Sequence, residues 1–236
     1  MDSLLDNPVF NALNSGDSHL GSGTENVKFF DEEVSPFAGF KSEYENGFDD
    51  LHELLPAGRK ILYATRKNIT EPRGWKMISA TEGLQFIHVS GKSIMSKHLD
   101  PVPLGQKHVD EMVALAALTK PGPFSSRTIE FGSYFGIFEN ERLVAMTGQR
   151  MHIRQGTDSL RRIPTFTEVS AVCTHPEFLG KGYAGFLLKH QLDLIINVGH
   201  VPFLHVRSDN ERAISLYERI GFKLNGPMNF YFLKRV

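Results

Sequence analysis

The residues best able to support chemistry are three closely spaced glycines in a run that links a predicted strand to a predicted helix. Gly180, Gly182 and Gly185 lie in residues 174–185, THPEFLGKGYAG. Glycines at the start of a helix let backbone N–H groups surround a phosphate, and the helix dipole adds to the attraction. The run therefore predicts a site for a phosphate-bearing ligand.

Two nucleotide-binding motifs are alternatives for this loop. The glycines spell the G-x-G-x-x-G fingerprint of Rossmann domains, but six residues separate them from the predicted strand, where a Rossmann turn is tight. Only 51 residues follow Gly185, too few for the rest of such a domain. The loop has no Gly-Lys-Ser/Thr sequence, so it is not a P-loop. A nucleotide-binding module and a purely structural glycine turn stay open as alternatives.

The elements that must position this loop follow from hydrophobic periodicity and turn residues. The pattern predicts helices over 106–118 and 184–196 and strands over 134–138, 143–153, 166–174 and 202–207. Ser208 and Glu211 predict a capping box for a last helix, which ends at Gly221, and two short strands follow. This order of helices and strands indicates an α+β fold with a mixed sheet.

Composition excludes several classes of protein. The chain has 236 residues with 41% hydrophobic and 22% charged residues, which is typical of a globular protein with a full core. Lys and Arg number 26 against 27 Asp and Glu, so the net charge of −1 argues against coating DNA or an anionic membrane. A single cysteine, Cys173, excludes a disulfide framework and a multi-cysteine zinc site, and the ten histidines show no metal-ligand spacing. The longest apolar run has seven residues, and the N-terminus is acidic, so we expect a cytoplasmic protein.

From about Gln106 to the C-terminus, the chain resembles the GNAT superfamily of N-acetyltransferases. Residues 167–176, TEVSAVCTHP, and the glycine loop are similar to its acyl-CoA motif, whose loop runs Arg/Gln-x-x-Gly-x-Gly/Ala. Leu179, Gly182 and Ala184 align with that loop, and Leu179 departs from the usual Arg or Gln. Residues 210–222, NERAISLYERIGF, resemble the Asn-x-x-Ala-x-x-Leu-Tyr-x-x-x-Gly-Phe motif without a gap. Both stretches are most similar to the branch related to glycine N-acyltransferases.

The resemblance implies a GNAT acyl-CoA N-acyltransferase fold over residues 92–236 and transfer of an acetyl group from acetyl-CoA to a primary amine. The expected acceptor is a small molecule or amino acid, and a homodimer is compatible with the resemblance. No metal is expected. The alternative from another class is a catalytically weak acyl-CoA-binding sensor or interaction module.

The resemblance also assigns residues to the cofactor. Backbone amides of the loop would hold the pyrophosphate with Lys181 adding charge, and the strand over 168–174 would splay from the strand over 202–207 to receive the pantetheine. The amide of Val172 would polarise the thioester carbonyl. The predicted cofactor-binding residues are Val172, Cys173, Thr174, Leu179, Gly180, Lys181, Gly182, Tyr183, Ala184, Asn210 and Ala213.

Tyr217 and Glu168 are the predicted catalytic residues. Tyr217 shares a helical stripe with Asn210 and Ala213, and a phenol that stays protonated suits a departing thiolate. Glu168, eleven residues before Leu179, is the candidate base, with a raised pKa expected beside the sheet; a solvated or ion-paired strand carboxylate is the alternative.

Two further side chains are weaker candidates. His205 could act as a base but fits a core histidine better. Cys173 is expected to be a small buried residue, since a covalent acyl-cysteine would need His175 as its base.

Residues 1–91 are predicted to form a small N-terminal α/β unit without a catalytic motif. The pattern indicates a helix over 48–55 and strands over 60–65, 75–79 and 84–89, while the polar stretch 14–26 fits a flexible tail or an ordered loop. So small a unit cannot bury a large core alone. We expect it to pack on the rest of the chain, where a reduced copy of the same fold could extend or flank the sheet, and to shape the acceptor site or a dimer contact.

Overall fold

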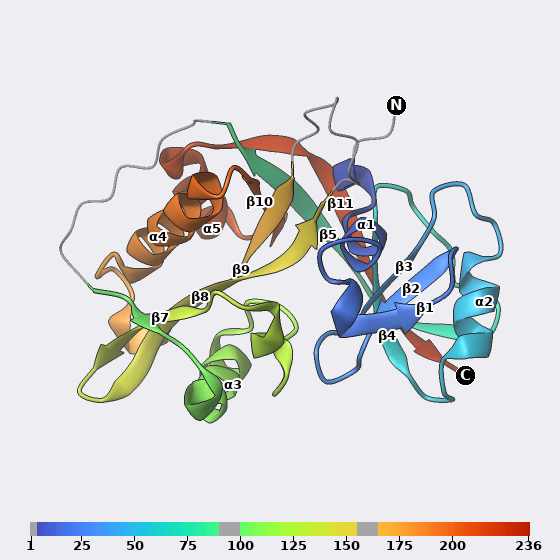
Figure 1. The fold of residues 1–236 in the computed structure, drawn as a ribbon, viewed down its shortest axis with the longest axis horizontal. Coiled ribbons are helices and arrows are strands. Elements are labelled where there is room, and N and C mark those ends of the chain that lie inside the picture. The colour runs from blue at the N-terminus through green and yellow to red at the C-terminus, as the bar shows by residue number, and fades with distance from the viewer. Residues whose placement is uncertain (1–3, 90–99, 155–164) are drawn as a thin grey trace.

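A computed structural model describes residues 4–89, 100–154 and 165–236. The predicted boundary between residues 91 and 92 lies outside these ranges. Within them, the strands form one eleven-stranded sheet in the order β1-β2-β3-β4-β11-β5-β10-β9-β8-β7-β6 (Figure 1). Two pairs of neighbours, β3–β4 and β9–β10, are parallel, and the others are antiparallel. The mixed sheet confirms the predicted α+β fold.

The elements have the following bounds. The strands are β1 (Gly21–Gly23), β2 (Val27–Phe30), β3 (Phe37–Phe40), β4 (Lys60–Thr65), β5 (Trp75–His88), β6 (Val102–Pro103), β7 (Phe135–Glu139), β8 (Arg142–Ile153), β9 (Phe166–Thr174), β10 (Val201–Arg207) and β11 (Phe222–Arg235). The α-helices are α1 (Pro8–Leu13), α2 (Gly47–Leu54), α3 (Val109–Thr119), α4 (Tyr183–Asn197) and α5 (Glu211–Ile220). The structure also contains short 3₁₀ turns, among them Ser18–Leu20, Gln106–His108, Thr128–Phe131 and Pro176–Phe178.

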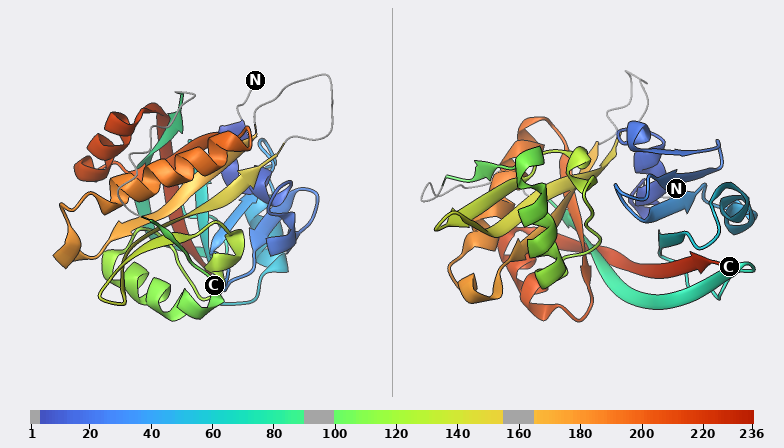
Figure 2. Two further views of the ribbon diagram at one scale, coloured as in Figure 1. Left: turned by 60° about the vertical axis from the view of Figure 1, so that its left-hand side comes forward. Right: turned by 90° about the horizontal axis from the view of Figure 1, so that it is seen from below.

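Two long strands, β5 and β11, join the two halves of the molecule (Figure 2). Each was expected as two short strands, but each runs unbroken for 14 residues. Pro227 and Gly83, residues that commonly interrupt strands, lie in adjacent pairs of this ladder: Pro227 pairs with Leu84, and Met228 pairs with Gly83. A register shift between Leu224 and Gly226 forms a β-bulge, so that β11 continues past these residues and does not end there.

The predicted N-terminal unit shares this sheet: β1–β4 extend it, and β5 lies within it, between β11 and β10. Its strand β4 pairs with β11, and β5 pairs with both β11 and β10. One hydrophobic cluster combines Leu13, Phe30 and Phe37 with Met112 and Phe203. The N-terminal unit therefore shares its core with the remainder of the chain, while the division into 1–91 and 92–236 stays a prediction.

The polar stretch near the N-terminus is ordered and not a flexible tail. It contains the 3₁₀ turn Ser18–Leu20 and strand β1. The carboxylate of Asp17 accepts a hydrogen bond from the backbone N–H of His152 (2.9 Å) and contacts its imidazole Nδ1 (2.7 Å). This buried contact fastens the stretch to β8.

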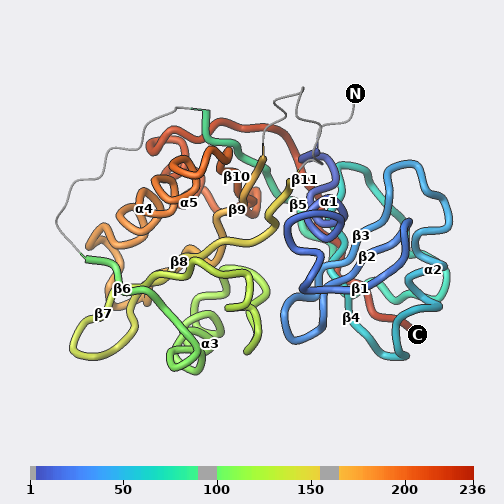
Figure 3. The backbone as a smooth tube through the Cα atoms, in the orientation of Figure 1, coloured from blue at the N-terminus to red at the C-terminus, as the bar shows by residue number. Residues whose placement is uncertain are grey.

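Helices cover the strands around the site on both faces (Figures 1 and 3). Leu188 and Leu192 of α4 belong to a cluster with Val169 of β9, whereas Met112 of α3 belongs to the cluster that contains Cys173. In the described ranges, no helix combines the length and apolar character needed to cross a membrane.

Candidate active site

Strands β9 and β10 separate after a short parallel contact. Val201–Phe203 of β10 pair with Phe166–Glu168 of β9, and no pairing joins the rest of the two strands. Beyond this point β10 stays paired with β5, and β9 with β8. The predicted splay is confirmed, and it leaves backbone groups of β9 facing an opening.

A β-bulge accompanies the splay. Met146 of β8 pairs with Cys173 and Gly148 with Ser170, so Ala171 and Val172 together oppose one residue of β8. Ala171 has a φ of 52°, in the left-handed region that a residue with a Cβ rarely adopts. Because a bulge bends its strand and increases the local twist, it directs the end of β9 away from β10.

The glycine loop presents open backbone at the start of α4. Gly180 and Gly182 each have a φ of +84°, and a Cβ added to either would meet no atom within 4 Å. Gly182 is the N-cap residue of the 15-residue helix α4. The positive φ values require glycine here, and the free space in front of them fits the pyrophosphate of a CoA ester.

A cavity of about 750 Å³ connects the loop with the splayed strands. Eleven of the thirteen predicted site residues line it: Val172, Cys173, Thr174, Leu179, Gly180, Gly182, Tyr183, Ala184, Asn210, Ala213 and Tyr217. Glu168 and Lys181 do not. The structure thus brings the two motifs together at one place.

Lys181 is directed to the β7–β8 hairpin. Its ammonium lies 3.3 Å from Glu139 Oε1 and 4.8 Å from the centre of the Phe178 ring. The hydroxyl of Tyr183 donates to the same Glu139 carboxylate. These contacts tie the glycine loop to the hairpin and make Lys181 a partly neutralised charge.

Tyr217 lies on α5 and is 7% exposed. Burial, with smaller contributions from Glu168 and Cys173, raises the pKa of its phenol to about 12. The hydroxyl therefore keeps its proton throughout the neutral range. Asn210 begins the helix: its side-chain oxygen accepts the N–H of Ala213 at 3.2 Å.

The predicted capping box is wrong. Ser208 donates its hydroxyl to the backbone oxygen of Glu82 at 3.2 Å, because it belongs to the turn that follows β10. The capping oxygen comes instead from Asn210, two residues later. Ser208, Asp209 and Asn210 are all residue types that favour an N-cap. Which of them caps the helix depends on where the chain leaves β10, and the sequence alone does not show this.

Glu168 is a buried and fully paired carboxylate. Arg150 donates to it from Nε at 2.7 Å and from Nη2 at 3.0 Å, and His205 Nδ1 lies at 2.9 Å. Burial alone would raise the pKa of Glu168, but the charge of Arg150 and the hydrogen bonds from Arg150 and His205 lower it to about 2. The expected rise in pKa is wrong, because the opposing charge comes from neighbouring strands far away in the sequence.

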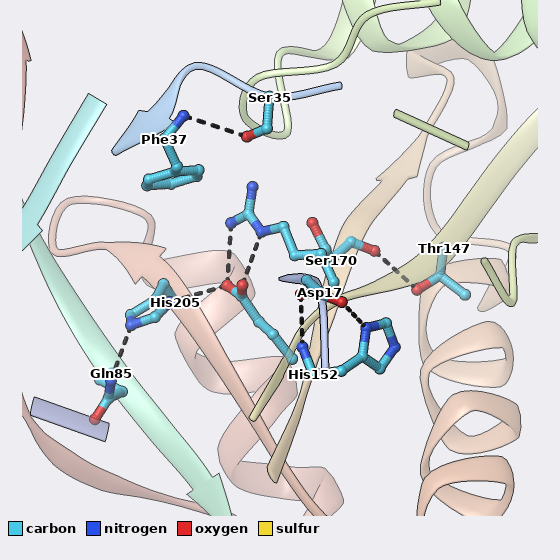
Figure 4. A network of polar contacts seen from close by, with 10 residues as sticks. Asp17, Ser35, Phe37, Gln85, Thr147, His152, Ser170 and His205 are labelled. Atoms are coloured by element: carbon cyan, nitrogen blue, oxygen red, sulfur yellow. Dashed lines mark hydrogen bonds and ion pairs between the residues drawn. The ribbon is translucent and has the colours of Figure 1, made fainter. Parts of the chain in front are cut away.

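His205 is held between two groups (Figure 4). The amide oxygen of Gln85 accepts hydrogen bonds from Arg66 and Asn225, both at 2.7 Å, so the amide nitrogen is the donor toward His205 Nε2 at 2.9 Å. His205 must then carry its proton on Nδ1 and donate it to Glu168. This neutral histidine faces the cavity with no spare nitrogen lone pair.

Cys173 shows no sign of a nucleophile. Burial raises the pKa of its thiol to about 11. Both nitrogens of His175 are engaged elsewhere, with Arg142 Nη2 at 2.6 Å and the backbone N–H of Glu177 at 3.2 Å. Among the residues that the structure describes, no cluster of His, Cys, Asp or Glu could hold a metal ion.

The far end of the cavity is formed by residues that carry no sequence motif. It is lined by Arg150 and His205 together with Phe37, Leu62, Thr81 and Phe230. The guanidinium of Arg150 lies 4.9 Å from the centre of the Phe37 ring. Of these side chains the sequence points only to His205, and because they come from six different strands, no spacing in the sequence marks them as a group.

Comparisons with known proteins show similarity in both sequence and structure. The family model described as FR47-like protein matches residues 134–232. The chain is 33% identical over 94 residues to N-alpha-acetyltransferase RimI of Mycobacterium tuberculosis, a match that covers 39% of this chain and 58% of that relative.

The solved structures extend the likeness to the whole chain. A GNAT-family acetyltransferase from Novosphingobium aromaticivorans is 33% identical, with a TM-score of 0.88 and complete coverage of both chains. A GCN5-related N-acetyltransferase from Kribbella flavida shares the fold at 14% identity, with a TM-score of 0.59 over 97% of this chain and 95% of its own. The chain belongs to the GNAT family of acetyltransferases.

Proposed function

We propose that the protein transfers an acetyl group from acetyl-CoA to the primary amine of a small molecule or amino acid. The observation that carries this proposal is the single cavity that joins the open glycine loop, the splayed end of β9 and the phenol of Tyr217. The two motifs resemble the branch related to glycine N-acyltransferases, whose members act on small acceptors, and this supports the acceptor class.

The backbone of the loop would hold the cofactor. N–H groups of residues 180–184, at the positive end of the α4 dipole, suit the pyrophosphate, and this recognition needs no side chain at Leu179. The unpaired part of β9 can hydrogen-bond to the pantetheine amides in the manner of an added strand. Acetyl-CoA supplies the activated acyl group as a thioester.

Residues near the middle of the cavity would assist the chemistry. The N–H of Val172, at the bulge, would stabilise negative charge on the carbonyl oxygen. The hydroxyl of Tyr217 would donate its proton to the departing sulfur. Its pKa of about 12 keeps that proton available at every physiological pH.

Glu168 is not suited to act as the base. A carboxyl with a pKa of about 2 that already accepts three hydrogen bonds holds a proton poorly, and Glu168 does not line the cavity. We propose that it positions Arg150 and His205 instead. The acceptor would then bind as a neutral amine, form the C–N bond as the C–S bond breaks, and lose one proton to water, from which the phenolate of Tyr217 regains its own.

The test is thiol release from acetyl-CoA across a panel of amines, amino acids and a peptide with a free N-terminus. Tyr217→Phe should lower kcat about 10²-fold and leave acetyl-CoA affinity nearly unchanged. Tyr231→Phe, a tyrosine that is also buried but lies in another hydrophobic cluster, is the matched control and should keep wild-type turnover.

The same panel of acceptors also tests two other candidate functions, acetylation of protein N-termini and acyl-CoA sensing. The relative named N-alpha-acetyltransferase supports the inclusion of the peptide, and turnover of the peptide alone would redirect the proposal to protein N-termini. An acyl-CoA sensor, favoured by Leu179 in place of the usual Arg or Gln, would bind acetyl-CoA without thiol release for any acceptor. Unchanged turnover in a folded Tyr217→Phe variant would remove the phenol from the chemistry.

A further inference from the structure

One donor of Arg150 is unused at the far end of the cavity. Nε and Nη2 of its guanidinium are both taken by Glu168. Nη1 donates to no group in the part of the chain that the structure describes, and the side chain lines the cavity. A guanidinium nitrogen in this position is an anchor for an acceptor oxygen.

The charges around the cavity favour an anionic ligand. Its lining, within the described ranges, contains no Asp or Glu but includes Lys120, Arg150, Arg207, Arg212 and Arg219. Arg212 and Arg219 lie on α5, beside the glycine loop that suits the phosphates of CoA. Arg150 lies at the opposite, acceptor end, where an ammonium group would find no carboxylate partner in the lining.

Aromatic rings line the same part of the cavity as this donor. The ring centres of Phe37 and Phe230 are 6.4 Å apart, and those of His205 and Phe230 are 5.4 Å apart. The guanidinium lies against Phe37. Rings that exclude water strengthen a charge-assisted hydrogen bond, because the local dielectric constant falls.

Glu168 fixes the direction of the donor. Its two oxygens hold two nitrogens of the planar guanidinium, and its side chain is only 1% exposed. The plane of Arg150 is therefore set before a ligand arrives, and little rotamer freedom is lost on binding.

We propose that Arg150 Nη1 binds the carboxylate of the acceptor, so that the acceptors are amino carboxylic acids whose apolar parts lie against Phe37 and Phe230. This inference rests on the proposed function and narrows it to one substrate class. Arg150 is then the residue that selects the acceptor, and it takes no part in the chemistry at the thioester.

The experiment compares acceptors that differ only at the carboxylate. Phenylalanine and leucine are each paired with their carboxamides, and kcat/KM is measured for thiol release. The amine of a carboxamide is easier to deprotonate than that of the acid, so a preference for the acid cannot come from amine reactivity. We expect the wild type to prefer the acid by at least about 10-fold, the scale of one hydrogen bond between charged groups.

Two variants assign that preference to Arg150. Arg150→Gln alone leaves Glu168 buried without its partner, so the double variant Arg150→Gln/Glu168→Gln is made as well to keep a neutral hydrogen-bonded pair. In the double variant the acid/carboxamide ratio should fall to about 1. Arg127→Gln changes an arginine that pairs with Glu130 and does not line the cavity, and it should keep the wild-type ratio.

A second measurement is independent of turnover. Titration calorimetry of phenylalanine into the protein saturated with CoA should show binding in the wild type and roughly 10- to 100-fold weaker binding in the double variant. Acetyl-CoA affinity should be unchanged in both.

The outcomes separate this inference from the proposed function. Thiol release with carboxamides or simple amines at the same or a higher rate than with the acids overturns the role of Arg150 and leaves acetyl transfer intact. Binding of acetyl-CoA without thiol release for any acceptor, and without phenylalanine binding, overturns both. A wild-type ratio retained in a folded double variant also overturns the inference.

Discussion

We expect the two ends of the cavity to recognise their proposed ligands, cofactor and acceptor, by different means. At the cofactor end, backbone groups of residues 180–184 and of β9 come from one nearly continuous segment, and Gly180 and Gly182 keep the space in front of them free. At the acceptor end, side chains from β3, β4, β5, β8, β10 and β11 meet, among them Phe37, Arg150 and His205.

This difference determines which substitutions each end of the cavity can tolerate. A backbone site depends on chain direction and on glycine, so Leu179 can replace a polar residue there without closing the site. A side-chain site depends on each residue and on its partners, as the contacts of Glu168 with Arg150 and His205 show. The N-terminal unit contributes to the acceptor end through Phe37 and Leu62, which supports the expectation that it shapes acceptor choice.

The largest effect should come from placing a charged side chain in the backbone site. Gly182→Asp introduces a carboxylate where the pyrophosphate is expected, at a φ of +84°, and should abolish acetyl-CoA binding. Thermal unfolding with and without acetyl-CoA measures this: the ligand should raise the Tm of the wild type and leave that of the variant unchanged.

A matched control removes the effect of backbone strain. Gly58 has a φ of +79° with equally open space around a Cβ, and it is not among the residues that line the cavity. Gly58→Asp should be stabilised by acetyl-CoA as the wild type is. Equal ligand stabilisation of the Gly182→Asp variant would contradict the loop as the phosphate site.

The second effect is on stability and concerns the acceptor end. Glu168→Ala leaves Arg150 buried without its counter-charge and should reduce the free energy of unfolding by about 3–5 kcal/mol. Urea unfolding measures it. Glu130→Ala, which breaks an exposed pair with Arg127, should cost less than about 1 kcal/mol. If the two variants are equally stable, the buried pair does not hold the acceptor end together.

The sequence predicts the elements whose structure depends on residues that are neighbours along the chain. Strand β9 begins and ends as predicted, and α4 and α5 follow their apolar stripes. The glycine loop lies between β9 and α4, as predicted, because it is one run of consecutive residues. Eleven of thirteen predicted site residues line one cavity for the same reason.

The sequence does not predict a property that depends on residues far apart along the chain. The pKa of Glu168 moves in the opposite direction to the expected one, because Arg150 and His205 lie 18 and 37 residues away along the chain. The bulge at Ala171 and the far end of the cavity likewise arise from strand pairing. The sheet must be assembled before these features exist, and no local pattern marks them.

A third effect is the pH dependence of stability. The pKa of Glu168 is about 2 in the folded protein against an ordinary 4.5, so its contribution is complete above pH 4.5 and is lost as the pH falls toward 2. The pair should account for about 3 kcal/mol of the acid destabilisation. Urea midpoints between pH 7 and pH 2 measure the slope. Glu168→Ala should be less stable at neutral pH and lose less on acidification; a slope equal to that of the wild type would contradict the assignment.

The smallest effect lies where the cofactor end does use a side chain. The oxygen of Asn210 caps α5 by accepting the N–H of Ala213, while its amide nitrogen has no partner among the described residues and the side chain lines the cavity. We predict that this nitrogen donates one hydrogen bond to acetyl-CoA. Asn210→Ser keeps a capping oxygen and replaces the amide NH₂ with a shorter hydroxyl that no longer reaches the amide's position, so stability should stay within about 0.5 kcal/mol and acetyl-CoA affinity should fall about 3- to 10-fold.

Asn210→Ala is the companion variant, because it removes the cap as well. It should lose about 1 kcal/mol of stability in urea unfolding and show the same loss of affinity in titration calorimetry as the serine variant. If serine retains the wild-type affinity and only alanine loses it, the asparagine acts through the helix cap alone. The cofactor end would then be recognised by backbone groups throughout this region, which would widen the contrast with the acceptor end.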